Sequence, residues 1–80
     1  MLLNELPDGA RGSVRGLLPA GRELGEEGLQ RLAELGFIAG EPVQVLRRGP
    51  GGREPLAVLV GETLFALRLA EARCVEVDLA

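Results

Sequence analysis

The stretch LAVLVGETLFALRL, which spans residues 56–69, decides the fold. It contains two apolar runs, 56–60 and 63–69, which only Gly61 and Glu62 separate. A two-residue connection that begins with glycine is typical of a type II′ β-hairpin, because glycine tolerates positive φ at the first turn position. The sequence therefore predicts two antiparallel strands joined by a turn in which Gly61 is a structural residue.

Further strands are expected on both sides of this hairpin, at residues 12–18, 43–48 and 74–79. Glycine and proline separate these segments at short intervals, which is typical of a small all-β domain. Strict alternation along the first of them would place Leu18 on the same face as Val14, and Leu17 on the opposite face.

One helix is expected, over residues 26–35, because apolar residues recur there at spacings of three and four: Leu29, Leu32, Ala33 and Leu35. Gly28 weakens its first half, so a late start is expected. Gly36 is suited to the left-handed position after the helix, with Phe37 as the apolar contact that accompanies such an end. Gly40 is expected to turn the chain toward the next strand.

Five strands and one helix in 80 residues predict an all-β fold, a small β-barrel with one helix. The strand number suits an SH3-like or OB-like barrel, partly open, and closure of such a sheet removes exposed strand edges. Residues 1–80 are expected to form a single domain, since nothing in the sequence resembles a linker.

The composition excludes most catalytic chemistry. The chain has no His, Lys, Trp or Tyr, and a single Cys, Cys74, so it cannot build a histidine-based triad, a lysine Schiff base or an internal disulfide. A formal net charge of −3 argues against nucleic-acid binding. The sequence predicts a protein that is not an enzyme and needs no cofactor or metal.

No targeting or membrane segment is visible. No run approaches the ~20 apolar residues of a membrane-spanning helix, and the first residues lack the basic region of a signal peptide. A cytoplasmic protein without direct membrane insertion is expected, and its oligomeric state is left between a monomer and a weak oligomer.

A few residues are candidates for contact with a partner. Arg47 and Arg48 end one strand, and Arg53 lies across the following glycine-rich loop. The three arginines either form a contact patch for a partner or belong to a solvated loop that maintains solubility. Phe37 is either a core residue or a partly exposed anchor. The glycine-rich loop lacks a GK[ST] sequence and joins two strands, which argues against a phosphate site.

Two clusters have simpler explanations than chemistry. The carboxylates of Glu23, Glu26 and Glu27 fit the solvated start of a helix, where the helix dipole favours negative charge. Cys74 opens the last strand and is expected to act as a small apolar residue.

The middle and end of the chain resemble the FeoA family of ferrous iron transport proteins. The motifs are LAELGFIAG at 32–40, VQVLRRGP at 43–50, EPL at 54–56 and GETLFALRLAEA at 61–72, followed by VEV at 75–77. Two positions depart from the family pattern: Ala39 stands where the family often has Pro, and residues 49–53 are richer in glycine.

This resemblance implies an SH3-like barrel with an inserted helix, in a small cytoplasmic protein without enzymatic activity. It implies that the chain binds a FeoB-type permease, a membrane protein with a cytoplasmic GTPase domain, and promotes or regulates ferrous iron uptake. The surface near the helix and the 47–53 hairpin is the expected contact.

A second function stays open. The same fold occurs as the C-terminal domain of iron- and manganese-dependent repressors, which carry a DNA-binding helix-turn-helix upstream. Because this sequence starts at Met1, an isolated accessory module of such a regulator is the alternative.

Overall fold

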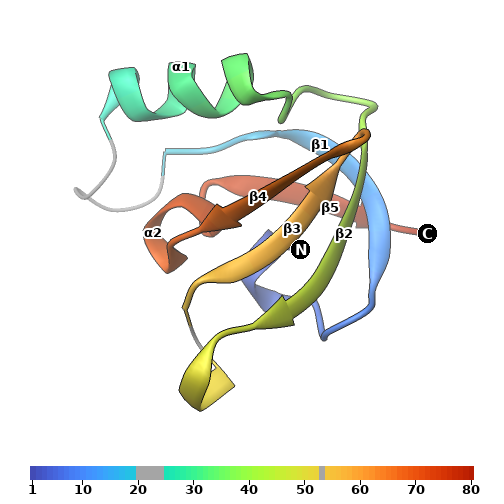
Figure 1. Cartoon of the computed structure of the whole chain (residues 1–80). Coiled ribbons are helices and arrows are strands. Elements are labelled where there is room, and N and C mark those ends of the chain that lie inside the picture. Colours follow the sequence, from blue (N-terminus) through green and yellow to red (C-terminus); the bar gives the residue numbers. More distant parts are fainter. Residues whose placement is uncertain (20–24, 53) are drawn as a thin grey trace.

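Five strands form one antiparallel sheet in the order β4-β3-β2-β1-β5 (Figure 1). The strands are β1 (Arg11–Leu17), β2 (Pro42–Arg48), β3 (Leu56–Val60), β4 (Thr63–Leu67) and β5 (Val75–Leu79). The computed structural model describes residues 1–19, 25–52 and 54–80. The sheet curves into a barrel that does not close, since β4 and β5 each have one neighbour in the sheet. The expected all-β fold with a partly open barrel is confirmed.

The predicted hairpin is present between β3 and β4. Val60 lies opposite Thr63 across a two-residue turn, and Gly61 has a φ of +58°. Glu62 does not have positive φ, so the turn is not of type I′, which requires positive φ at both positions, and it agrees with type II′.

Strand β4 ends two residues earlier than expected, at Leu67, because a short helix, α2 (Leu69–Ala72), follows it. The carboxylate of Glu71 accepts a hydrogen bond from the backbone N–H of Arg68 at 2.8 Å, and that of Glu54 accepts one from Leu69 at 2.6 Å. These carboxylates satisfy N–H groups at the start of α2 that have no partner within the helix. Glu71 therefore binds the backbone of Arg68.

Helix α1 (Glu26–Leu35) has the predicted bounds. The expected late start is wrong: Glu26 and Glu27 occupy the first turn despite Gly28. Gly36, at φ +116°, ends the helix as predicted: its N–H donates to the carbonyl of Ala33, and the next N–H, of Phe37, donates to that of Leu32 at 3.1 Å. This pair of hydrogen bonds is a Schellman motif.

The core lies between the inner face of the sheet, the end of α1 and the first turn of the chain, η1 (Leu3–Glu5). The N-terminal residues also cover the outer edge of β5, where the N–H of Val77 donates to the carbonyl of Met1 at 2.7 Å. The buried residues are Leu3, Leu6, Val14, Leu32, Phe37, Val43, Val45, Leu56, Val58, Val60, Leu67, Ala72, Cys74, Val75 and Val77.

A β-bulge changes the expected faces of β1. The register against β5 shifts between Val14 and Gly16, so Arg15 is an extra residue in the strand. Because one extra residue reverses the alternation, Leu17 packs against the core and Leu18 is exposed. The strict alternation expected for this segment is therefore wrong beyond Val14.

We predict that two glycines of β1 respond differently to alanine. A Cβ at Gly12 would collide with the carbonyl of Asp78 and the side chain of Val77, where β1 pairs with β5, whereas a Cβ at Gly16 meets no atom within 4 Å. Gly12→Ala should lower the free energy of unfolding by about 1–3 kcal/mol, measured by urea denaturation. Gly16→Ala, which has no collision and reduces the entropy of the unfolded chain, should leave it unchanged or raise it slightly. Equal losses in both variants would contradict this prediction.

Candidate interaction surface

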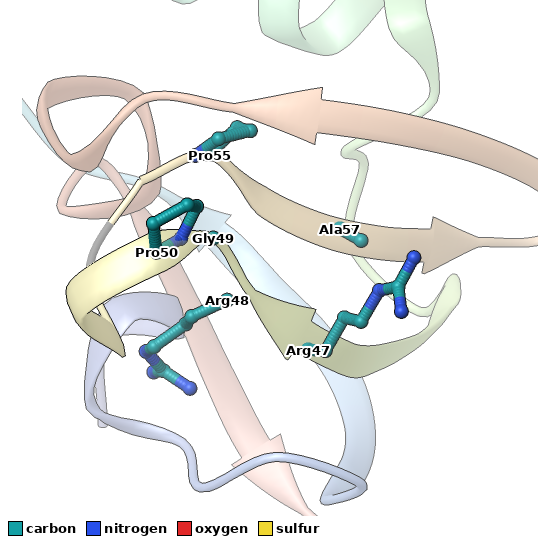
Figure 2. A pocket seen from close by; sticks show the side chains of 6 residues that line it. All are labelled: Arg47, Arg48, Gly49, Pro50, Pro55 and Ala57. Atoms are coloured by element: carbon teal, nitrogen blue, oxygen red, sulfur yellow. The ribbon is translucent and has the colours of Figure 1, made fainter.

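The two arginines that end β2 point away from each other. Figure 2 shows the guanidinium of Arg47 beside Ala57 on β3, and that of Arg48 directed toward the N-terminal segment. Consecutive side chains of a strand emerge on opposite faces, so the two guanidinium groups lie apart, although both residues border the pocket at the end of β2. The expected patch of three arginines is not formed by this pair, and Arg53 lies outside the described residues.

Arg48 is a structural residue. Its guanidinium donates hydrogen bonds to the carbonyls of Asn4 (2.8 Å) and Leu6 (2.6 Å) and to the carboxylate of Asp8 (2.6 Å). Only 15% of its side chain is exposed. These bonds hold the N-terminal segment against the end of β2, and they leave little of the guanidinium for a partner.

Arg47 is exposed, and its side chain has no hydrogen-bond or ion-pair partner in the described part of the chain. It lines an open pocket of about 450 Å³ whose walls include Ala57 and the rings of Pro50 and Pro55 (Figure 2). An accessible guanidinium beside apolar ring and methyl surface suits a carboxylate on an apolar segment.

Phe37 belongs to the core. Its side chain is 0% exposed, and its ring lies 6.0 Å from that of Phe65, tilted by 46°. Of the two alternatives for Phe37, a core residue or a partly exposed anchor, the core residue agrees with its position. A fully buried ring cannot contact a partner directly. Ile38, the next residue, is exposed.

The expected contact near both the helix and the 47–53 hairpin does not correspond to one surface. Figure 1 shows α1 at the opposite end of the molecule from the connection between β2 and β3, which contains η2 (Pro50–Gly52). A partner that contacts the Arg47 pocket therefore contacts the sheet rather than the helix.

The predicted turn glycines lie where the chain turns. Gly36, Gly40 and Gly61 all have positive φ. The N–H of Gly40 donates to the carbonyl of Val14 at 2.8 Å, which ties the end of the helix connection to β1. Their contribution to a site is therefore indirect: they position the strands that carry it.

The described residues offer little for chemistry. Within 1–19, 25–52 and 54–80, no group of three or more Cys, Asp or Glu side chains is arranged to hold a metal ion. Cys74 is buried, with its Sγ 3.4 Å from the carbonyl oxygen of Ala70. Of the acidic cluster, Glu26 and Glu27 are solvated at the start of α1, and Glu23 lies outside the described residues.

None of the helices described is long and apolar enough to cross a membrane.

Two exposed apolar residues of the sheet were not predicted from the sequence. Leu64 and Ala66 of β4 are exposed, while the alternating residues Phe65 and Leu67 contribute to the core. The signal was an unbroken apolar run in a strand at the edge of a sheet, where one face is expected to be polar.

Comparisons with known proteins give a consistent match. The FeoA domain family matches residues 1–79. A FeoA protein of Stenotrophomonas maltophilia, solved with zinc and described as a prokaryotic SH3-domain protein, is 44% identical; the match covers 98% of this chain and 89% of that one, with a TM-score of 0.84. No curated protein sequence matches the chain.

Two other structures define the range of the match. An iron uptake regulatory protein, also described as FeoA, is 30% identical over 100% of this chain and 97% of that one, with a TM-score of 0.81. A manganese-dependent transcriptional repressor shares the fold, with a TM-score of 0.80, at 19% identity, over 100% of this chain but 41% of the repressor.

We predict that the two arginines of β2 differ in their effect on stability. Arg48→Ala removes the donor to two carbonyls and one carboxylate, and should lower the free energy of unfolding by about 1–3 kcal/mol. Arg47→Ala removes an exposed side chain without a described partner, and should change it by less than about 0.5 kcal/mol. Chemical denaturation monitored by circular dichroism measures both, and equal effects would contradict the structural role of Arg48.

Proposed function

Because this chain belongs to the FeoA family, we propose that it is a cytoplasmic accessory protein that binds the cytoplasmic portion of a FeoB-type GTPase permease. Through this contact it promotes or regulates ferrous iron uptake. The observation that carries the proposal is the family match over residues 1–79, which leaves almost no part of the chain outside the family's domain.

The chemistry of the chain supports a role in binding. As a member of this family, the chain is a non-enzymatic accessory domain associated with ferrous iron transport. It has no histidine or lysine for acid–base or nucleophilic catalysis near neutral pH. The Stenotrophomonas maltophilia relative is described as a candidate activating factor of ferrous iron transport, which agrees with an effect exerted on a transporter.

An accessory role toward a metal-dependent repressor is the second candidate. It rests on the fold shared with the manganese-dependent repressor, of which this chain spans less than half the length. At 19% identity that likeness concerns the fold alone, so the transporter is the favoured partner. Titration of the chain with a repressor and with the cytoplasmic portion of the permease separates the two.

We predict that the chain binds the permease and that uptake depends on it. The tagged chain should retain the cytoplasmic portion of the permease in a pull-down, and deletion of the chain should lower the rate of ferrous iron uptake, with re-expression restoring it. Uptake that is unchanged by deletion would contradict the proposed function, and a pull-down of a repressor in place of the permease would favour the second candidate.

We also predict that the chain alone takes up no stoichiometric Fe²⁺ or Zn²⁺ at neutral pH. Tight sites for these ions favour imidazole or thiolate ligands, and this chain has no histidine and one buried cysteine. Calorimetric titration of each ion should give no saturable heat. An equimolar binding isotherm would contradict the prediction.

A further inference from the structure

The outer face of β2, β3 and β4 is formed by two rows of residues that lie opposite one another across the strands. Opposite residues of antiparallel strands point to the same side of a sheet. The pairing of β2 with β3 and of β3 with β4 places Gln44, Leu59 and Leu64 in one row, and Arg47, Ala57 and Ala66 in the other. We refer to these six residues as the outer face.

The outer face is apolar in its centre and toward β4. Leu64 is 60% exposed, Ala66 is exposed, and Leu59 and Ala57 are half-buried beside them. The core side of the same strands is filled by buried residues such as Val58 and Leu67, so these outward side chains contribute nothing to the core. Figure 1 shows no helix lying across β2 and β3 on this side.

The charged groups of this surface are arginines. Strands β2, β3 and β4 contain no Asp or Glu, although the chain as a whole carries a net charge of −3. Arg47 lies in the face itself, and Arg11 of β1 extends the row of Gln44. Neither side chain has a partner in the described part of the chain.

The surrounding carboxylates lie at the margins of the outer face. Glu41 precedes β2 and Glu62 occupies the β3–β4 turn, both at the end of the face away from Arg47. Glu54, in the connection before β3, accepts a hydrogen bond from the backbone N–H of Leu69. The positive charge of Arg47 is therefore not neutralised by an ion pair within the described chain.

Two hollows open on this surface, and each contains one of the free arginines. One, of about 450 Å³, is lined by Arg47 and Ala57 of the second row, together with Arg48, Gly49, Pro50 and Pro55 (Figure 2). The other, of about 290 Å³, is lined by Arg11, Gln44 and Leu59. The apolar residues of β3 and β4 in the outer face adjoin both hollows, since Ala57 lines the first and Leu59 the second. A peptide segment that covers these apolar residues would therefore have an arginine within reach of its side chains.

We propose that the outer face binds a segment of the permease's cytoplasmic portion in which apolar side chains are flanked by carboxylates. This rests on the proposed function and names the surface through which it acts. The apolar side chains cover Leu59, Leu64 and Ala66, and a carboxylate pairs with Arg47. Charge complementarity selects an acidic occupant, since this surface presents unpaired cations and no carboxylate within its strands.

Other occupants fit the charges less well. A second copy of the chain on this face would bring Arg47 of each copy onto a surface of the same sign, and both molecules carry −3. An anionic membrane would attract Arg47 and Arg11 but repel the net charge of the chain. Both alternatives are outcomes of the experiment below.

The experiment compares two outer-face variants with two matched controls. Arg47→Glu and Leu64→Ser change the face, whereas Arg31→Glu and Ile38→Ser make the same changes at exposed residues of α1 and the turn after it. Affinity for the cytoplasmic portion of the permease is measured by calorimetry at low and at physiological salt, and circular dichroism confirms that each variant folds.

We expect each outer-face variant to weaken binding by about 10-fold or more, and each control to change it by less than about 3-fold. The salt dependence of binding should decrease in Arg47→Glu, because a charge pair is lost. Normal binding by Arg47→Glu and Leu64→Ser, or equal losses in the controls, would overturn this inference while leaving the proposed function intact.

Failure of the proposed function would appear differently. If the wild-type chain does not bind the permease at all, the proposed function and this surface assignment both fail. Sedimentation of the wild-type chain as a dimer that Leu64→Ser dissociates would overturn the assignment in favour of a second copy. Binding of the wild-type chain to phosphatidylserine vesicles that Arg47→Glu abolishes would overturn it in favour of a membrane surface.

Discussion

The contact between Phe37 and Phe65 is the interaction on which the arrangement of helix and sheet depends. These are the two aromatic residues of the whole chain, and they meet where the end of α1 reaches the hairpin strand β4. An aromatic side chain removes far more apolar surface from water than the valines that dominate the rest of the core. The left-handed turn at Gly36 directs Phe37 into this position, so a backbone feature of one residue determines how the helix packs.

Features that depend on neighbouring residues in the sequence could be predicted, and features that depend on distant ones could not. The hairpin at Gly61 and the helix end at Gly36 follow from local backbone requirements, and both are as expected. The bulge at Arg15 arises because β1 pairs with β5, more than 50 residues away, and no local pattern records that register. The fold was therefore predictable as a class, while the faces of β1 were not.

The same distinction applies to the candidate site. From the sequence, Arg47 and Arg48 are equivalent members of a basic pair. The structure separates them, because Arg48 finds carbonyl oxygens of residues 4 and 6, which tertiary packing alone brings near it. Leu64 and Ala66 were overlooked for the opposite reason: an apolar residue in a strand is expected to be buried, and these two lie on the outward side of β4, opposite Leu59 and Ala57 of β3.

The two edges of the sheet differ in what they can accept. Beside β5, Leu2 bridges to Glu76 and Met1 exchanges backbone hydrogen bonds with Val77, so that edge is already occupied in part. No strand of the described chain lies beyond β4. A sheet can extend through both of its edges only if neither edge is covered. Backbone pairing between two copies is therefore easier at their β4 edges than at β5, where Met1 and Leu2 already pair with the strand.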